Sequence, residues 1–266
     1  MDKPQSNNIK LGIPLMVMTT FVFAVQDGIS RHLAEQYNVI TIVMIRYWFF
    51  GAFVFLINSP FKYGFKTRVK SKQPLLQIFR GALLACEVCV MVLAFTKLGL
   101  VQSHAIFAFY PLIVLVLSGL FLREKIIPQI WVAILSGFIG VAILLNPGSA
   151  VFNVSSLIPF CSAVLFALYN VLTRYAAKTD SPETSYFWTG VSGAIFITFF
   201  GLFFWHPPTG TDWCWMGFLC VTGALGHYLL IKTLDIAQAS SVQPYAYLQL
   251  IFATGFGITF FSETIT

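Results

Sequence analysis

The sequence predicts an all-α membrane protein that crosses the lipid bilayer many times. Of its 266 residues, 58% are hydrophobic and only 10% are charged, and the mean hydropathy is +0.80. Soluble domains carry about a quarter charged residues. Nine apolar stretches are each long enough to cross about 30 Å of hydrocarbon, which takes about 20 residues of helix. Because lipid offers the backbone no hydrogen-bond partners, each stretch is expected to be helical.

Charged residues, glycines and prolines bound these stretches and set the expected helix limits. The first stretch begins at Leu11, is full length and has no small-residue cleavage site after it, so it is expected to remain as a permanent helix. The connections are short and leave no room for a separate soluble domain. The five cysteines are odd in number and lie in apolar stretches, which argues against a disulfide framework. The expected helices are 11–33, 38–58, 75–96, 100–122, 127–146, 154–175, 184–205, 213–234 and 240–261.

The basic residues predict the orientation of the chain. If the N-terminus is cytoplasmic, all of the 16 Lys and Arg residues except Arg31, Arg46 and Lys97 lie on the inside. Cytoplasmic connections are the ones that collect Lys and Arg, so this orientation is expected. The net charge of +6 therefore reflects topology and does not indicate a nucleic-acid partner, because the basic residues share no soluble face.

Two pairs of motifs indicate an internal repeat. Residues 23–31 read FAVQDGISR and residues 166–174 read FALYNVLTR, at a spacing of 143, while FLREKI around Glu124 resembles FFSETI around Glu263, at a spacing of 139. Five helices separate the copies, and because five is odd the second copy enters the membrane from the opposite side. Chance similarity between apolar helices is the alternative, which the shared order of the two motifs disfavours. Inverted repeats that enclose a midplane site are typical of secondary transporters.

The repeat predicts two domains and an incomplete second one. The first is expected at 11–146 and the second at 154–266. A helix follows Glu124, whereas only three residues follow Glu263. We therefore expect either that a tenth helix of about 20 apolar residues is missing from this sequence or that the protein departs from its own repeat.

Several motifs in order along nearly the whole chain resemble one known family, the ten-helix transporters built from two EamA domains in the drug/metabolite transporter superfamily. This resemblance implies a basket of ten helices with both termini cytoplasmic, which moves small polar metabolites by alternating access. The most similar branch carries S-adenosylmethionine inward, and exporters of amino acids and carriers of riboflavin are related. Ser262 stands where the family usually has Gly. The motifs are FAVQDGISR, IRYWFF, FRGALL, HAIFAFYPL, LREKI and GALGHYLLIKTLDIAQASSVQPYAYLQL.

Four charged residues stand out among those within the predicted helices, where a charge costs roughly 3 kcal/mol and usually faces a cavity or a partner. Asp27 is expected either to bind a substrate amine and exchange protons or to pair with Arg46, which otherwise suits a substrate carboxylate. Asp27 aligns with Asn170, so these two are expected to meet near the pseudo-twofold axis. Arg80 lies a turn inside the cytoplasmic end of its helix, which favours snorkelling. Glu87 lies deeper, is expected to be protonated or paired, and is a candidate for proton coupling.

Further candidates come from the remaining helices. His227 aligns within one residue of Glu87 and titrates near neutral pH, which suits proton coupling, although a histidine satisfied within the core is the alternative. Pro111 and Pro244 interrupt corresponding helices of the two halves and are candidate hinges, with a static kink as the alternative. On helical spacing, Gln243 and Tyr247 share one face and are candidate substrate-binding residues, and Tyr245 and Gln249 share a second face. The other candidate substrate-binding residues are His104, Phe107, Tyr110, Tyr186 and Trp188.

The chain is not expected to be an enzyme, because it has no zinc-protease HExxH motif, no GxSxG motif and no pair of intramembrane aspartates. No cofactor and no metal are expected. The expected partners are a small-molecule substrate and the lipid bilayer of a bacterial inner membrane, and a homodimer stays open. The predicted function is secondary transport of a small polar metabolite, by proton coupling or exchange. An intramembrane enzyme or a channel-like pore is the alternative.

Overall fold

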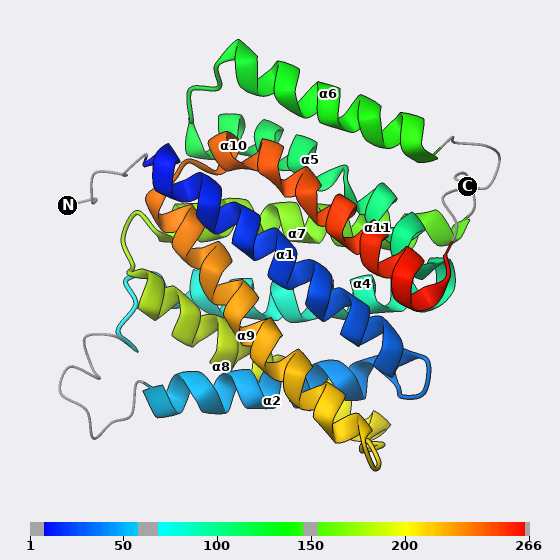
Figure 1. Cartoon of the computed structure of the whole chain (residues 1–266). Helices are drawn as coiled ribbons and strands as arrows, with labels where there is room; N and C mark the ends of the chain where they lie inside the picture. The colour runs from blue at the N-terminus through cyan, green and yellow to red at the C-terminus, as the bar shows by residue number, and fades with distance from the viewer. Residues whose placement is uncertain (1–7, 58–68, 146–153, 264–266) are drawn as a thin grey trace.

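The computed structural model describes residues 8–57, 69–145 and 154–263, and these residues form helices without a strand (Figure 1). The predicted all-α, polytopic class is confirmed. The helices of residues 8–145 are α1 (Ile9–Ala34), α2 (Val39–Ile57), α4 (Pro74–Phe107), α5 (Tyr110–Leu117), the π-helical turn η1 (Ser118–Leu122) and α6 (Pro128–Leu145). Those of residues 154–263 are η3 (Val154–Ser156), α7 (Leu157–Ala176), α8 (Pro182–Gly201), η4 (Leu202–Phe204), α9 (Asp212–Ile236), α10 (Ala239–Val242), η5 (Gln243–Tyr247) and α11 (Leu248–Phe261).

Local signals in the sequence explain where several helices begin. The side chain of Asn8 accepts a hydrogen bond from the backbone N–H of Leu11, at 3.3 Å, and caps α1. Ser181 caps α8 in the same way through the N–H of Thr184, at 3.1 Å. Pro74 and Pro128 occupy the first positions of α4 and α6, where a missing N–H costs nothing.

Two helices that the sequence predicts as continuous, 100–122 and 240–261, are broken in the structure. The predicted boundary between 75–96 and 100–122 is present within α4 as a kink at Gly99, whose φ of 79° is not helical. The predicted helix 100–122 is broken again after Phe107, where α4 ends before α5. The predicted helix 240–261 is divided into α10, a 3-10 segment and α11. Pro111 and Pro244 each lie in the first turn after a break, because a proline removes the N–H of the helical ladder. Both predicted interruptions are therefore present.

Pairs of helices from the two halves of the chain pack against each other, notably α1 with α9, α2 with α8, and α4 with both α7 and α8. Glycines allow the closest contacts. A Cβ atom at Gly193 of α8 would lie 2.2 Å from Cε1 of Tyr47 in α2, and one at Gly81 of α4 would lie 1.9 Å from Oγ of Ser192. Small residues in helix interfaces are typical of membrane proteins, because the attraction there depends on close packing.

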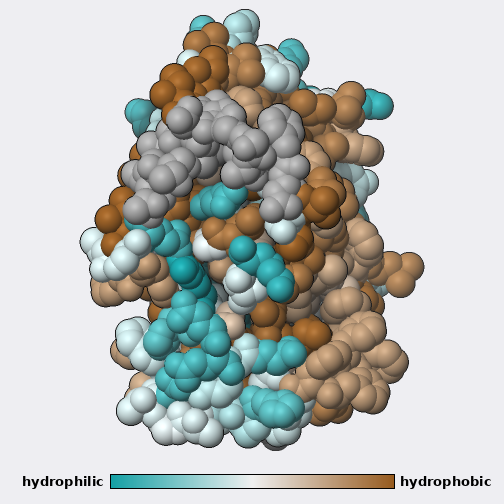
Figure 2. Space-filling view, turned by 90° about the vertical axis from the view of Figure 1, so that its right-hand side faces the viewer, coloured by the Kyte–Doolittle hydropathy of each residue, from teal (hydrophilic) through white to brown (hydrophobic). Residues whose placement is uncertain are grey.

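The outer surface of the bundle is apolar along the helices and polar at one end. Large hydrophobic side chains such as Leu56, Phe199 and Phe203 are exposed on the flanks. Figure 2 views the side where α1 and α11 end, and hydrophilic residues gather over much of that face, with hydrophobic residues along its flank. Six helical stretches of the described chain are long and apolar enough to cross a membrane, and one of them, the 49 residues Pro74–Leu122, joins two predicted helices across the kink at Gly99. The expectation of a tenth helix after Glu263 lies outside the described residues.

Candidate functional site

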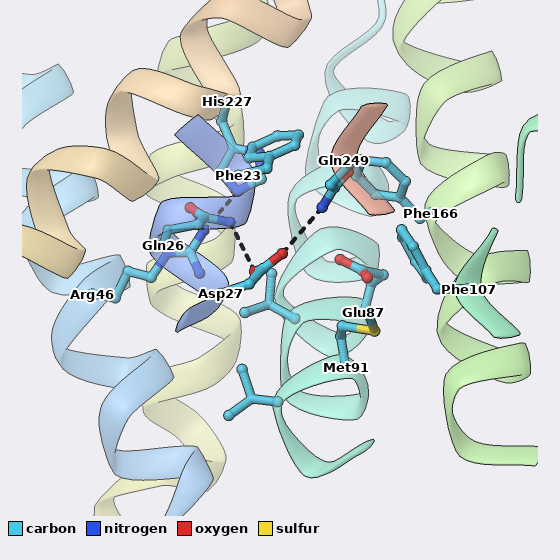
Figure 3. Close-up of a pocket in the computed structure, with 12 residues that line it drawn as sticks. Phe23, Gln26, Asp27, Arg46, Glu87, Met91, Phe107, Phe166, His227 and Gln249 are labelled. Atoms are coloured by element: carbon cyan, nitrogen blue, oxygen red, sulfur yellow. Dashed lines mark hydrogen bonds between the residues drawn. The ribbon is translucent and has the colours of Figure 1, made fainter. Parts of the chain in front are cut away.

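A polar cavity lies in the middle of the bundle, among helices from both halves of the chain (Figure 3). The space open to the centre of a water-sized molecule is about 30 Å³, enough for about two waters. In this conformation the cavity is therefore closed around a volume far smaller than a metabolite. It is lined by Phe23, Gln26, Asp27, Arg46, Glu87, Val88, Met91, Val92, Phe107, Phe166, His227 and Gln249.

Helical spacing places the polar residues of α1 in this cavity. Phe23, Gln26 and Asp27 are three and four residues apart, so they share one face of the helix. Glu87 and Met91 share a face of α4 in the same way. The sequence carries a charge on each of these faces because the faces point into the protein and away from lipid.

Arg46 is buried and binds two neutral partners. Its Nη2 atom donates to Oε1 of Gln26 at 3.0 Å and is 2.9 Å from Nε2 of His227. Because arginine has only donors, Nε2 of His227 must accept, which makes this imidazole neutral. Gly223 of α9 leaves room for the guanidinium, since a Cβ atom there would lie 2.4 Å from Nε of Arg46.

Asp27 does not contact Arg46, so the predicted direct pair is absent from this conformation. Gln26 lies between them: its Nε2 atom is 3.5 Å from Oδ1 of Asp27 while its Oε1 accepts from Arg46. The other oxygen of Asp27 accepts from Nε2 of Gln249 at 3.1 Å and lies 3.2 Å from Nε2 of His104. A glutamine thus links the two charges without neutralising either by direct contact.

Glu87 forms the third charged group of the cavity. It is buried, and Oγ of Ser162 donates to its Oε1 atom at 2.7 Å. The cavity therefore holds two carboxyl groups, Asp27 and Glu87, against one guanidinium. A cationic group or a proton would balance the surplus, because charges removed from water need compensation.

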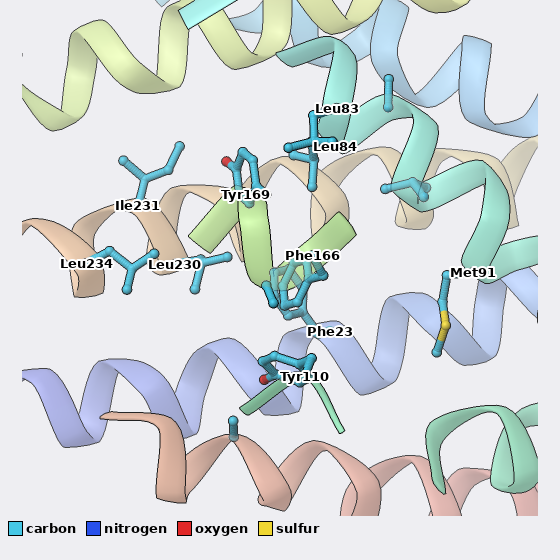
Figure 4. Packing of buried hydrophobic residues seen from close by; sticks show 14 of the residues in the cluster. Phe23, Leu83, Leu84, Met91, Tyr110, Phe166, Tyr169, Leu230, Ile231 and Leu234 are labelled. Atoms are coloured by element: carbon cyan, nitrogen blue, oxygen red, sulfur yellow. The ribbon is translucent and has the colours of Figure 1, made fainter. Parts of the chain in front are cut away.

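Aromatic rings form the opposite wall of the cavity and continue into the core (Figure 4). The ring of Phe166 lies 6.1 Å from that of Phe23, 5.5 Å from that of Phe107 and 5.1 Å from that of Tyr110. Figure 3 shows Phe107 and Phe166 on one side of the carboxyl groups. Such rings can stack on a planar group or face a cation.

The expectation that Asp27 and Asn170 meet is wrong, and the rings explain why. Phe23 and Phe166, also a matched pair of the repeat, are the residues that meet. Helices α1 and α7 run in opposite directions, so residues one turn beyond the crossing point, about 6 Å along each axis, diverge toward opposite ends. Asn170 is buried away from the cavity, and its Nδ2 donates to the carbonyl of Phe166 at 2.8 Å.

Arg80 does not snorkel, contrary to the interpretation that the sequence favours. Its side chain is fully buried and donates to Oγ1 of Thr173 at 3.1 Å, to Oγ1 of Thr189 at 3.3 Å and to Oε1 of Gln77. The sequence gives the depth of Arg80 along its helix, but only the packing of α4 on α7 and α8 decides that this face points inward.

The remaining candidates lie outside the central cavity. Tyr186 donates to the carbonyl of Ala224 at 2.8 Å, and Nε1 of Trp188 donates to the carbonyl of Val69 at 2.9 Å. Tyr247 donates to the carbonyl of Ile134 at 3.2 Å, toward α6. The side-chain amide of Gln243 is buried without a hydrogen-bond partner among the described residues. A smaller cavity, which shares Phe107 and Gln249 with the first, is also lined by His104, Tyr110, Pro111 and Tyr247.

In the helix around Pro244, a residue of the second predicted face lines the central cavity. Gln249 lines the central cavity, whereas Gln243 and Tyr247, the candidates for substrate binding, do not. The cause is the 3-10 segment Gln243–Tyr247, which advances 120° per residue in place of 100° and so rotates the following helix. Gln26, Ser162 and the rings of Phe23 and Phe166 were also missed, although Gln26 and Phe23 lie within the motif that contains Asp27.

The fold and the cavity together define a class: a helical membrane protein with a charged, water-sized cavity enclosed between two halves of the chain. Residues 10–146 and, separately, 154–266 match the EamA-like transporter family. The chain belongs to this family, whose members are transporters and not enzymes. Among the described residues, no group of three or more His, Cys, Asp or Glu side chains is arranged to hold a metal ion.

Several bacterial relatives are named as transporters of small metabolites. The chain is 26% identical to the S-adenosylmethionine uptake transporter of Rickettsia felis over 95% of this chain and 85% of that protein. It is 28% identical to the riboflavin transporter of Vibrio cholerae, over 88% and 80% respectively. One solved crystal structure superposes with a TM-score of 0.73 over 97% of this chain and 90% of its own, at 14% identity, which shows the shared fold. The protein is therefore an integral membrane transporter of a small metabolite.

Proposed function

We propose that this protein is a secondary carrier for a small metabolite that bears both a positive and a negative group, of the kind represented by S-adenosylmethionine. The observation that carries the proposal is the arrangement of charges in the central cavity. Arg46 has only neutral hydrogen-bond partners there, and Asp27 and Glu87 have no guanidinium in direct contact. Arg46 and Glu87 are thus available to groups of opposite sign on a substrate, and Asp27 can bind a cationic group beside His104.

The chemistry of S-adenosylmethionine matches these groups one by one. Its carboxylate suits Arg46, which can bind a carboxylate with two parallel N–H donors. Its ammonium and sulfonium groups suit Asp27 and Glu87, and its adenine suits the rings of Phe107 and Phe166. Riboflavin, the compound in the name of another relative, has a large ring system without these charges. The three buried ionisable groups of the cavity therefore favour the charged substrate.

Transport requires that the closed cavity open toward one side of the membrane at a time. The space of about 30 Å³ holds water but no metabolite, so the two halves of the chain, 11–146 and 154–266, must separate around it. Glu87 and Asp27 are the proposed sites of proton coupling or exchange, since the surplus negative charge favours binding of a proton when no cationic substrate is present. His227 is a third proposed site, neutral in this conformation. We further propose a bacterial inner-membrane location with a cytoplasmic N-terminus.

Counterflow in proteoliposomes tests the proposal. Vesicles loaded with unlabelled S-adenosylmethionine are expected to accumulate the labelled compound transiently, and unlabelled riboflavin in its place is expected not to support this uptake. A channel gives no counterflow, and an enzyme returns an altered product. Counterflow with riboflavin and none with S-adenosylmethionine would contradict the assigned substrate class.

A further inference from the structure

Glu124 and Glu263, the aligned glutamates of the repeat, make the same set of contacts at opposite ends of the molecule. The carboxylate of Glu124 accepts from the backbone N–H groups of Ala239 and Ser240, at 3.2 and 3.1 Å. That of Glu263 accepts from the N–H groups of Leu100 and Val101, at 2.9 and 2.8 Å. These partners are themselves related by the spacing of 139. Each glutamate thus binds the start of a helical segment in the other half of the chain, where exposed N–H groups attract an anion.

Each glutamate also pairs with an arginine of the other half. Oε1 of Glu124 lies 3.4 Å from Nε of Arg174, at the end of α7. Glu263 pairs with Arg31, at the end of α1. We call the first set, with Ala239 and Ser240, the Glu124 clasp.

The second set, Glu263 with Arg31, Leu100 and Val101, is the Glu263 clasp. The backbone before each glutamate is left-handed, with φ of 55° at Arg123 and 53° at Ser262. The N–H of each glutamate returns to a carbonyl six residues earlier, that of Ser118 or of Gly257. The clasps are therefore built alike by the local backbone as well as by the partners.

The two clasps lie on opposite sides of the cavity. Arg174 donates to the carbonyls of Leu234 and Asp235, and the neighbouring carbonyl of Ile236 accepts from the N–H of Asn8, so the Glu124 clasp adjoins the start of α1. Arg31 is near the end of α1, about 33 Å away along the helix. Figure 1 agrees, with α10 beside the start of α1 and the end of α11 beside its end. Asp27 and the cavity lie between them.

We propose that the Glu124 and Glu263 clasps are the two gates of the transport pathway, and that they break one at a time. This proposal rests on the carrier function proposed above. Both clasps join the two halves, so the halves cannot separate at either end while the clasp at that end is intact. Both are formed in this conformation, in which the cavity is closed. Charge-assisted hydrogen bonds are strong enough to hold a gate, and water can replace them when the gate opens.

The Glu124 clasp has one more hydrogen bond to its carboxylate than the Glu263 clasp. Oγ of Ser240 donates a further hydrogen bond to Glu124 at 2.6 Å, whereas Val101 occupies the matching position in the Glu263 clasp and has no side-chain donor. Arg174 is also held by two backbone carbonyls of α9. Without substrate, the Glu263 end is therefore expected to open more often.

Thiol labelling tests this gate proposal without any substrate. Met91→Cys places a reporter in the cavity wall once the five native cysteines, Cys86, Cys89, Cys161, Cys214 and Cys220, are replaced. A membrane-impermeant maleimide is added from each side of the membrane in turn. Glu263→Gln is expected to raise labelling from the Glu263 side about tenfold and to lower it from the other side, and Glu124→Gln to do the reverse.

Two milder variants keep the proposal falsifiable if either glutamine variant fails to fold. Ser240→Ala removes one hydroxyl from the Glu124 clasp and is expected to raise labelling from that side. Val101→Thr replaces a methyl group by a hydroxyl group of similar volume, which can donate to Glu263. It is expected to lower labelling from the Glu263 side. Equal changes in labelling from both sides, or no change from either side, would contradict the gate proposal. The carrier function fails separately, by absence of counterflow in the wild-type protein.

Discussion

Gln26 connects the two opposite charges of the central cavity while keeping them apart. Its amide accepts from Arg46 with one atom and donates to Asp27 with the other. A direct ion pair would satisfy both residues and would have to break before either bound a substrate. The glutamine leaves Arg46 with neutral partners and Asp27 without a guanidinium in contact, so a substrate can reach either charge without breaking a direct pair between them.

Removal of either charge is expected to abolish uptake while the protein still inserts into the membrane. For Asp27→Asn and Arg46→Ala, we expect uptake of the substrate to fall roughly 30-fold or more, because each variant leaves the opposite charge of a buried substrate unpaired. Uptake into cells or vesicles checks this, with insertion followed by detergent size-exclusion chromatography. Asp212→Asn is the matched control, since Asp212 binds Tyr37 outside the cavity. Uptake at the wild-type rate in both cavity variants would show that Asp27 and Arg46 do not bind the substrate.

Gly223 is expected to be required for the position of Arg46. A methyl group there would lie 2.4 Å from Nε of Arg46, so Gly223→Ala should push the guanidinium away from Gln26 and His227. We expect a rise in KM for uptake of about tenfold with normal insertion, as a misplaced charged hydrogen bond costs about that factor. Gly217→Ala in the same helix is the control, because a Cβ atom there meets nothing within 4 Å. Equal kinetics in both variants would count against this role.

Breaks in corresponding helices of the two halves bring polar residues to the cavity. Prolines in the sequence predicted both interruptions, and the structure has them before Pro111 and at Pro244. The kind of break was not predictable from the sequence alone. A 3-10 segment rotates α11 and places Gln249 in the cavity in place of Tyr247. Whether these breaks act as hinges stays a prediction.

Helix α8 depends on glycine for its contact with α2. In Gly193→Ala, the added methyl group would overlap the ring of Tyr47, so we expect a loss of about 1–3 kcal/mol in the free energy of unfolding. The midpoint of thermal unfolding in detergent should fall accordingly. Gly255→Ala in α11 meets nothing within 4 Å and should leave the midpoint unchanged or raise it. A Gly193→Ala midpoint equal to wild type would show that α2 and α8 separate without strain.

At the scale of the whole molecule, the distribution of basic residues predicts a cytoplasmic N-terminus. The connection between α7 and α8, with Lys178, is expected inside, and the connection between α8 and α9, with His206, outside. In a protein without native cysteines, His206→Cys should react with an impermeant thiol reagent added to intact cells, and Lys178→Cys only after the cells are opened. The opposite pattern would reverse the orientation. Lys62, Lys66 and Arg68, which also support the prediction, lie outside the described residues.

The sequence by itself determined the helical membrane fold, the approximate helix limits, the family and the charged residues Asp27, Arg46 and Glu87. Hydropathy and the cost of a charge in lipid act locally along the chain, so they can be evaluated without coordinates. Only the tertiary structure decided which matched residues meet, that Gln26 lies between the charges, and that Arg80 is buried. These depend on how helices cross and rotate about their axes, and a shift of one residue, 100° of rotation, changes which side chain faces the cavity.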